Sequence, residues 1–110
     1  MEKFAWVNLL YDFYGQLLTE HQRKFVELYY GQDLSLSEIA EHYRLSRQAI
    51  HDVLKRAESS LFKYEEKLGL VNRFLEQRKR LNQALEILDG EQGDKIFRVR
   101  KIINEAMELF

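Results

Sequence analysis

The stretch Ser35–Arg56, SLSEIAEHYRLSRQAIHDVLKR, decides the fold, because it contains two helix starts separated by a short turn. Ser35 and Glu38 have the S-x-x-E spacing of a capping box, which marks the start of a helix. Ser46 is an N-cap candidate for a second helix, and apolar residues follow it at helical spacing. The stretch therefore predicts a helix-turn-helix motif over residues 35–57.

Several positions of this motif meet packing demands. Ala40 is small where the two helices would cross closely, and Ile39 and Tyr43 are expected to point into the core. Leu45 is expected to fill the turn. Arg44 occupies the turn position that commonly holds glycine, so it must either adopt a left-handed conformation at some cost or avoid it.

The second helix of the motif has a polar face and an apolar face. At 100° per residue, its polar side chains fall within an arc of about 140°, whereas the apolar residues cluster opposite; the polar set is Arg47, Gln48, His51, Asp52 and Lys55, and the apolar set is Ile50, Val53, Leu54 and Ala57. Such a separation predicts that one face packs on the domain and the other is presented to solvent or to a ligand.

The polar face suggests readout of a nucleic acid. Arginine and glutamine near a helix N-terminus can read guanine and adenine bidentately in the major groove, so Arg47 and Gln48 are the candidate base readers. His51 could contact either bases or phosphates, and Asp52 must face away from phosphate or accept from cytosine N4. The candidates for phosphate contact, where a point charge suffices, are Arg44, Lys55 and Arg56. A polar outer face that is merely solvated remains the alternative interpretation.

Composition points to one all-α domain. The chain has 110 residues, 45% of them hydrophobic, with no proline and five glycines, which favours helices over a sheet. Cysteine is absent, and polar residues interrupt the apolar N-terminus, so we expect a cytoplasmic protein without a signal peptide or membrane insertion. The net charge is −1, but residues 44–56 carry four basic side chains and one acidic one.

Two helices are predicted before the motif. Apolar residues in two adjacent rows, from Phe4 to Leu18, cover about half of a helix circumference, wider than the usual single stripe. This helix should contact two partners, either two parts of its own fold or another subunit. Thr19 and Gln22 form a capping box for a second helix, which Gly31 ends.

The region after the motif allows several arrangements. Leucines spaced by seven, at positions 54, 61, 68 and 75, leave a coiled coil, a helical hairpin and a dimer arm open. A loop over residues 89–94 precedes a last helix. We expect residues 1–60 to form the helix-turn-helix domain, and residues 61–110 to form a helical arm or dimerisation segment of the same domain.

A second basic cluster occurs in this C-terminal region, at Arg73, Arg78, Lys79 and Arg80. It is either a solvated helix flank or a phosphate-contact patch for structured RNA. The three histidines lack a second ligand at a convincing spacing, and no phosphate-binding glycine loop is present. We therefore expect no metal, no cofactor and no enzymatic activity.

The stretch Leu18–Leu61, LTEHQRKFVELYYGQDLSLSEIAEHYRLSRQAIHDVLKRAESSL, resembles region 4 of bacterial sigma factors through SEIA, Ser46, Ile50 and KRA. The space before the motif is too short for the polymerase-binding region, so a complete sigma factor is not expected. The combination of LYDFYGQLLTEHQ, SLSEIAEHYRLSRQAIHD and YEEKLGL resembles the YlxM family over roughly residues 9 to 85. The matching motif residues are Ser37, Glu38, Ile39, Ala40, Ser46, Arg47, Gln48 and Ala49.

These resemblances imply an all-helical, sigma-region-4-like protein whose family genes lie beside those of the targeting GTPases of the signal recognition particle. The first hypothesis is a DNA-binding regulator acting as a homodimer. The second is an accessory protein that binds signal recognition particle RNA or its GTPase. A helix-turn-helix used only for protein contact is the third.

Overall fold

The computed structural model describes residues 1–109, and every regular element in that range is helical, as the composition predicts. The chain divides into two compact units, Met1–Val71 and the segment from Asn72 onward. The elements are, in order, α1 (Lys3–Tyr14), a 3₁₀ turn η1 (Gly15–Leu17), α2 (Glu20–Val26), a π-helical segment η2 (Glu27–Gly31), α3 (Leu36–Tyr43), α4 (Arg47–Leu68), α5 (Leu70–Leu88) and α6 (Asp94–Glu108).

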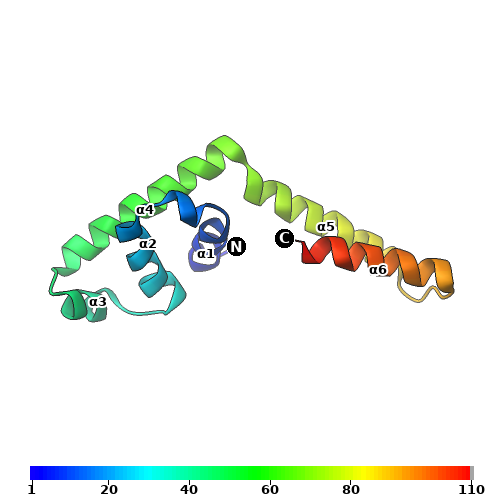
Figure 1. Ribbon diagram of the computed structural model, residues 1–110, viewed down its shortest axis with the longest axis horizontal. Coiled ribbons are helices and arrows are strands. Elements are labelled where there is room, and N and C mark those ends of the chain that lie inside the picture. The colour runs from blue at the N-terminus through cyan, green and yellow to red at the C-terminus, as the bar shows by residue number, and fades with distance from the viewer. Residues whose placement is uncertain (110) are drawn as a thin grey trace. The chain divides into compact units, whose positions relative to one another are not determined.

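The first unit is organised around α4, against which α1, α2 and α3 pack (Figure 1). Along one face of α4, buried residues recur every three or four positions, which is the helical period. Each large apolar side chain buried there contributes roughly 1.5–3 kcal/mol in transfer free energy. The surrounding helices supply the rest of this core, which includes Val7, Leu10, Phe25, Val26, Ile39, Ile50, Leu54, Ala57 and Leu61.

The first helix is shorter than predicted. It ends at Tyr14, and the chain continues as η1, so Leu17 is 56% exposed while Leu18 is buried. The ring of Tyr11 lies over Gly15, where an added Cβ would come within 2.8 Å of it. α1 contacts both α4 and η2, so the two partners expected of this wide apolar helix are two parts of its own fold.

The second helix begins as predicted. Thr19 and Gln22 form both hydrogen bonds of the capping box, at 3.1 and 3.2 Å. The helix extends to Gly31, but its last five residues widen into the π-helical segment η2. This segment carries Tyr30, whose hydroxyl donates a 2.7 Å hydrogen bond to Glu58 on α4.

The coiled-coil alternative for the leucine heptads is wrong, because the helix breaks at Gly69, which has a φ of +63°. The Tyr14 hydroxyl donates to the Glu65 carboxylate at 2.6 Å and accepts the backbone N–H of Leu70 at 3.1 Å. Glu65 also accepts the N–H of Val71 at 3.0 Å. The first N–H groups of a helix have no partner within the helix. At the start of α5, the side chains of Tyr14 and Glu65 accept hydrogen bonds from two of them.

The second unit is a helical hairpin, in which α5 and α6 run antiparallel (Figure 1). Arg78 on α5 donates to the carbonyl of Met107 near the end of α6, and Arg100 donates to the carbonyls of Leu88 and Glu91 near the loop. Of the three arrangements left open by the sequence, the hairpin is present. Over residues 1–109, no helix has the length and apolar character needed to cross a membrane.

Candidate nucleic-acid interface

The predicted helix-turn-helix is confirmed as α3, a three-residue turn and the N-terminal part of α4. Ser35 and Glu38 form both bonds of their capping box, at 3.0 and 3.1 Å. Ser46 caps α4 by accepting the N–H of Ala49 at 3.0 Å. These caps fix where each helix begins, so the exposed face of α4 starts directly after the turn.

The crossing of α3 and α4 is packed largely as predicted. Ile39 and Ile50 are fully buried and Ala40 is 6% exposed. Tyr43 is only half-buried; its ring meets the Phe25 ring edge-on at 5.4 Å. The prediction that Leu45 fills the turn is wrong, since its side chain is 42% exposed.

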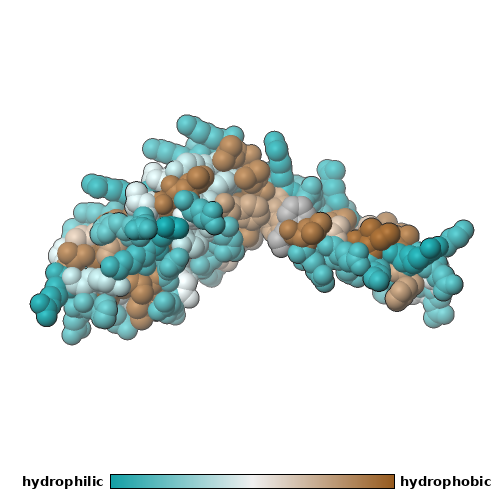
Figure 2. Space-filling view, viewed as in Figure 1, coloured by the Kyte–Doolittle hydropathy of each residue, from teal (hydrophilic) through white to brown (hydrophobic). Residues whose placement is uncertain are grey.

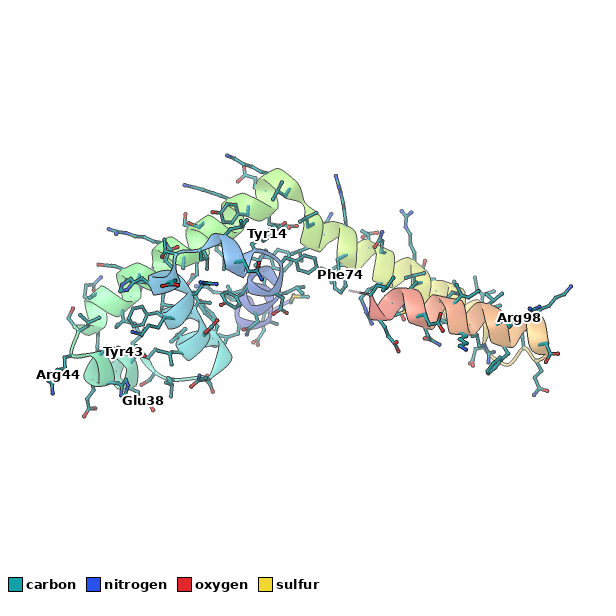
Figure 3. The ribbon with its side chains drawn as sticks, viewed as in Figure 1. Tyr14, Glu38, Tyr43, Arg44, Phe74 and Arg98 are labelled. Atoms are coloured by element: carbon teal, nitrogen blue, oxygen red, sulfur yellow. The ribbon has the colours of Figure 1, made fainter. Side chains whose placement is uncertain are left out.

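Arg44 adopts the left-handed conformation, with φ 55° and ψ 42°. The chain reverses there, and the N–H of Leu45 returns to the carbonyl of Ala40 at 3.0 Å, a 6→1 bond of the Schellman type. The conformation costs a non-glycine residue about 1–2 kcal/mol. The exposed Arg44 side chain projects from the turn, away from the body of the unit (Figure 3).

Arg47, Gln48 and His51 lie exposed at the N-terminal end of α4. Together with Leu36 on α3 they line a shallow depression of about 430 Å³. The three polar side chains are thus brought to one surface, as the helical periodicity predicts. Lys55 lies about two turns further along the helix than Arg47, roughly 12 Å from it at 1.5 Å per residue, and Arg56 follows Lys55 directly.

Two of the candidates are engaged within the chain. The Gln48 amide donates a 2.8 Å hydrogen bond to Asp52, whose carboxylate is also 3.7 Å from His51. Gln48 can therefore read a base only after exchanging this bond. Lys55 lies 3.8 Å from the Glu58 carboxylate. Among the described residues, no hydrogen bond or ion pair engages the guanidinium group of Arg47 or Arg56.

Glu58 is the important residue that the sequence analysis missed. It is the only charged side chain of the described residues that is buried, at 5% exposure, and Lys3 lies 2.9 Å from it. Burial opposes its ionisation, but the hydrogen bonds from Tyr30 and Lys3, with the charges of Lys3 and Lys55, hold the pKa of Glu58 below its usual value. The i,i+3 spacing from Lys55 was the available signal.

The second basic cluster is only partly available. Arg78 is taken up by the hairpin, where it bonds the Met107 carbonyl at 3.2 Å and lies 5.7 Å from the Phe74 ring centroid. Arg73, Lys79 and Arg80 are exposed. In residues 1–109, no three histidine, cysteine or acidic side chains are placed to hold a metal ion.

Residues 1–103 match the model of the family described as "Putative helix-turn-helix protein, YlxM / p13 like". The chain belongs to this family. It is 58% identical over 95 residues to a UPF0122 protein of Desulforamulus reducens, covering 86% of this chain and 81% of the relative. It is 44% identical over 95 residues to UPF0122 protein YlxM of Bacillus subtilis, covering 86% of each.

A third relative, UPF0122 protein lin1916 of Listeria innocua, is 53% identical over 108 residues, which cover 92% of this chain and 97% of the relative. The resemblance to the YlxM family is therefore confirmed, and it extends beyond the motif through most of α6. Membership of a YlxM-like helix-turn-helix family indicates nucleic-acid binding.

Proposed function

We propose that this protein binds duplex DNA without catalysing a reaction, by placing the N-terminal end of α4 in the major groove. The observation that carries the proposal is the arrangement of Arg44, Arg47 and Arg56. All three are exposed on or beside a capped helix of a helix-turn-helix, and neither Arg47 nor Arg56 has an ion-pair partner in the described chain. A helix-turn-helix contacts bases with this part of its second helix.

The side chains divide into different roles. Arg47, in the first turn of α4, has the geometry for a bidentate contact with guanine. Gln48 contacts a second base if that base replaces Asp52 as the hydrogen-bond partner of the Gln48 amide. Arg44 and Arg56 supply positive charge for phosphates on either side, whereas Lys55 does so in competition with Glu58.

The proposed working form is a cytoplasmic homodimer that acts as a regulator. A dimer would present two copies of α4 to successive major grooves, about 34 Å apart on one face of the DNA. Two half-sites also compensate for the small number of basic side chains in residues 44–56 of each subunit, because phosphate contacts then add over both.

The test is binding to a duplex selected from a random library, compared with a scrambled duplex of the same composition. Arg47→Ala should weaken binding to the selected duplex by roughly 10- to 100-fold and should change binding to the scrambled duplex little. Lys63→Ala is the matched control, because Lys63 is an exposed basic residue on the same helix about 24 Å further along. Equal losses on both duplexes would assign Arg47 to phosphate, and absence of duplex binding would overturn the proposal.

A second candidate is an accessory role at the signal recognition particle, through its RNA or its GTPase. The net charge of −1 favours this role over that of a DNA binder that slides freely. Crosslinking of the tagged protein in cells, followed by separate sequencing of recovered DNA and RNA, distinguishes the two. Enrichment of the particle's RNA without any DNA site would favour the second candidate.

A further inference from the structure

The helix α6 has an apolar stripe that the hairpin leaves uncovered. Its larger partly buried apolar residues, Ile96, Ile103 and Met107, lie along one side of the helix. Val99 and Ile102, with the C-cap residue Leu109 directly after α6, form a second row at steps of three and seven residues, centred about 100° around the helix from the first. These three side chains, here called the outer stripe, are 43%, 64% and 85% exposed. Hydrophobic side chains are visible on the surface of the hairpin in Figure 2.

The hairpin has too little core to stand as it is. No residue of α6 is buried, and the only buried residue of α5, Val71, belongs to the first unit. Fewer than about 40 residues rarely bury enough apolar surface to fold without further support. An additional helical surface on the outer stripe would supply the missing burial.

The charges on α6 indicate which surface that is. Its N-terminal half is basic, with Lys95, Arg98, Arg100 and Lys101, whereas its C-terminal half carries Glu105 and Glu108. A helix with this order complements a second copy of itself only when the two run antiparallel. Arg98 and Glu105 are seven residues apart and lie within about 20° of each other on one flank of the outer stripe.

We propose that two copies of this chain pair through α6, antiparallel, about a twofold axis near Ile102. The outer stripes then pack together, with Ile102 against its counterpart and Leu109 against the aliphatic stem of Lys95 in the other copy. Arg98 of each copy lies opposite Glu105 of the other, so the pairing is isologous and closes as a dimer. This inference deepens the proposed function, since it names the surface of the homodimer, but it does not depend on which nucleic acid is bound.

The opposite flank of α6 is a weaker candidate for the same contact. A groove of about 600 Å³ lies there, lined by Phe97, Arg100, Lys101, Asn104, Glu105 and Glu108. Phe97, at 69% exposure, is its single large apolar residue. One aromatic anchor among charged side chains lacks the repeated spacing that helix pairing requires.

The test measures the monomer–dimer equilibrium of the full chain by sedimentation equilibrium. Arg98→Glu and Glu105→Arg should each weaken the dimer by about tenfold or more, because each change places like charges opposite one another at two symmetric positions. The double variant R98E/E105R should restore the dimer to within roughly threefold of the starting protein, since it only exchanges the two partners.

A second pair of variants tests whether the dimer depends on the outer stripe itself or on any exposed apolar side chain of α6. Ile102→Gln should abolish the dimer, and Phe97→Gln, a matched change at a slightly more exposed residue on the other flank, should leave it intact. Circular dichroism checks that each variant keeps its helices. A monomeric starting protein, failure of the double variant to rescue, or equal effects of Ile102→Gln and Phe97→Gln would overturn the pairing. A monomer that still binds the selected duplex would overturn the α6 pairing but not the proposed DNA binding. A dimer that binds no duplex would overturn the proposed DNA binding but not the α6 pairing.

Discussion

The hydroxyl of Tyr30 should be a main support of the first unit, and Tyr30→Phe tests this directly. The hydroxyl donates a 2.7 Å hydrogen bond to the buried carboxylate of Glu58, and thereby joins η2 to the middle of α4. Burial and the hydrogen bond to Glu58 together raise the pKa of Tyr30, so its hydroxyl keeps its proton and remains a donor at neutral pH. The change to phenylalanine removes this donor and leaves the ring, which packs 4.7 Å from the Phe4 ring.

The size of the loss in unfolding free energy follows from the burial of this hydrogen bond and from the charge of its acceptor. Hydrogen bonds to a charged group contribute about 1.5–3 kcal/mol, so Tyr30→Phe should lower the free energy of unfolding by that amount. Lys3 also bonds Glu58, at 2.9 Å, but its side chain is 54% exposed. An exposed partner of this kind contributes about 0–1 kcal/mol after screening by solvent, so Lys3→Met should cost less than Tyr30→Phe.

Urea unfolding followed by tryptophan fluorescence measures both variants. Trp6 is the only tryptophan and lies on α1, so its signal reports the first unit alone. The reasoning requires unchanged m-values and a shift of the midpoint for Tyr30→Phe. Unfolding of Tyr30→Phe at the midpoint of the starting protein would refute it, and so would an equal shift for Lys3→Met.

The same network predicts the direction of the pH dependence. The pKa of Glu58 is below its ordinary value of 4.5 in the folded state. Its contribution is therefore complete above that value and is lost as the pH falls through the lower, folded pKa. The cost of Tyr30→Phe should be full at pH 7 and should shrink as the pH falls below 4.5 and through the folded pKa of Glu58. A cost that does not shrink over the pH range in which Glu58 is observed to take up its proton would show that the ionised form of Glu58 is not the acceptor.

Three further changes test other features of the structure. Arg44→Gly should raise the free energy of unfolding by about 1 kcal/mol, because glycine adopts the left-handed conformation without strain. The same change should weaken binding to every duplex equally, because it removes a phosphate contact. Unfolding and binding assays on one preparation measure both effects. Gly15→Ala should cost roughly 1–3 kcal/mol because the new Cβ would meet the Tyr11 ring, whereas Gly31→Ala, with nothing within 4 Å, is its control in urea unfolding. Asp52→Asn should strengthen binding to unselected duplexes by roughly threefold, by removing a repulsion from phosphate; fluorescence anisotropy that shows no gain would place Asp52 away from the backbone.

The helix starts could be predicted from the sequence because their causes are local. Thr19, Ser35 and Ser46 each satisfy backbone donors within three residues, so the caps need no knowledge of the rest of the fold. The apolar face of α4 follows from periodicity for the same reason.

Features that depend on distant contacts could not be predicted. The break after α4 involves Gly69 together with the hydroxyl of Tyr14, 55 residues earlier in the chain. A periodic pattern shows which side of a helix is apolar, but it does not show where a neighbouring segment stops covering it.

The positions of the candidate side chains could be predicted from the sequence, but whether those side chains are free to bind a ligand could not. A helical wheel places Gln48, Lys55 and Arg47 on one face, and the structure agrees. It does not show that Gln48 already has a partner in Asp52, or that Lys55 shares Glu58 with a lysine from α1. Contacts made by these two must replace internal ones, so each gains less on binding than its type suggests. Arg47 has no such exchange to make, and sequence preference should therefore depend more on this residue than on its neighbour in the first turn.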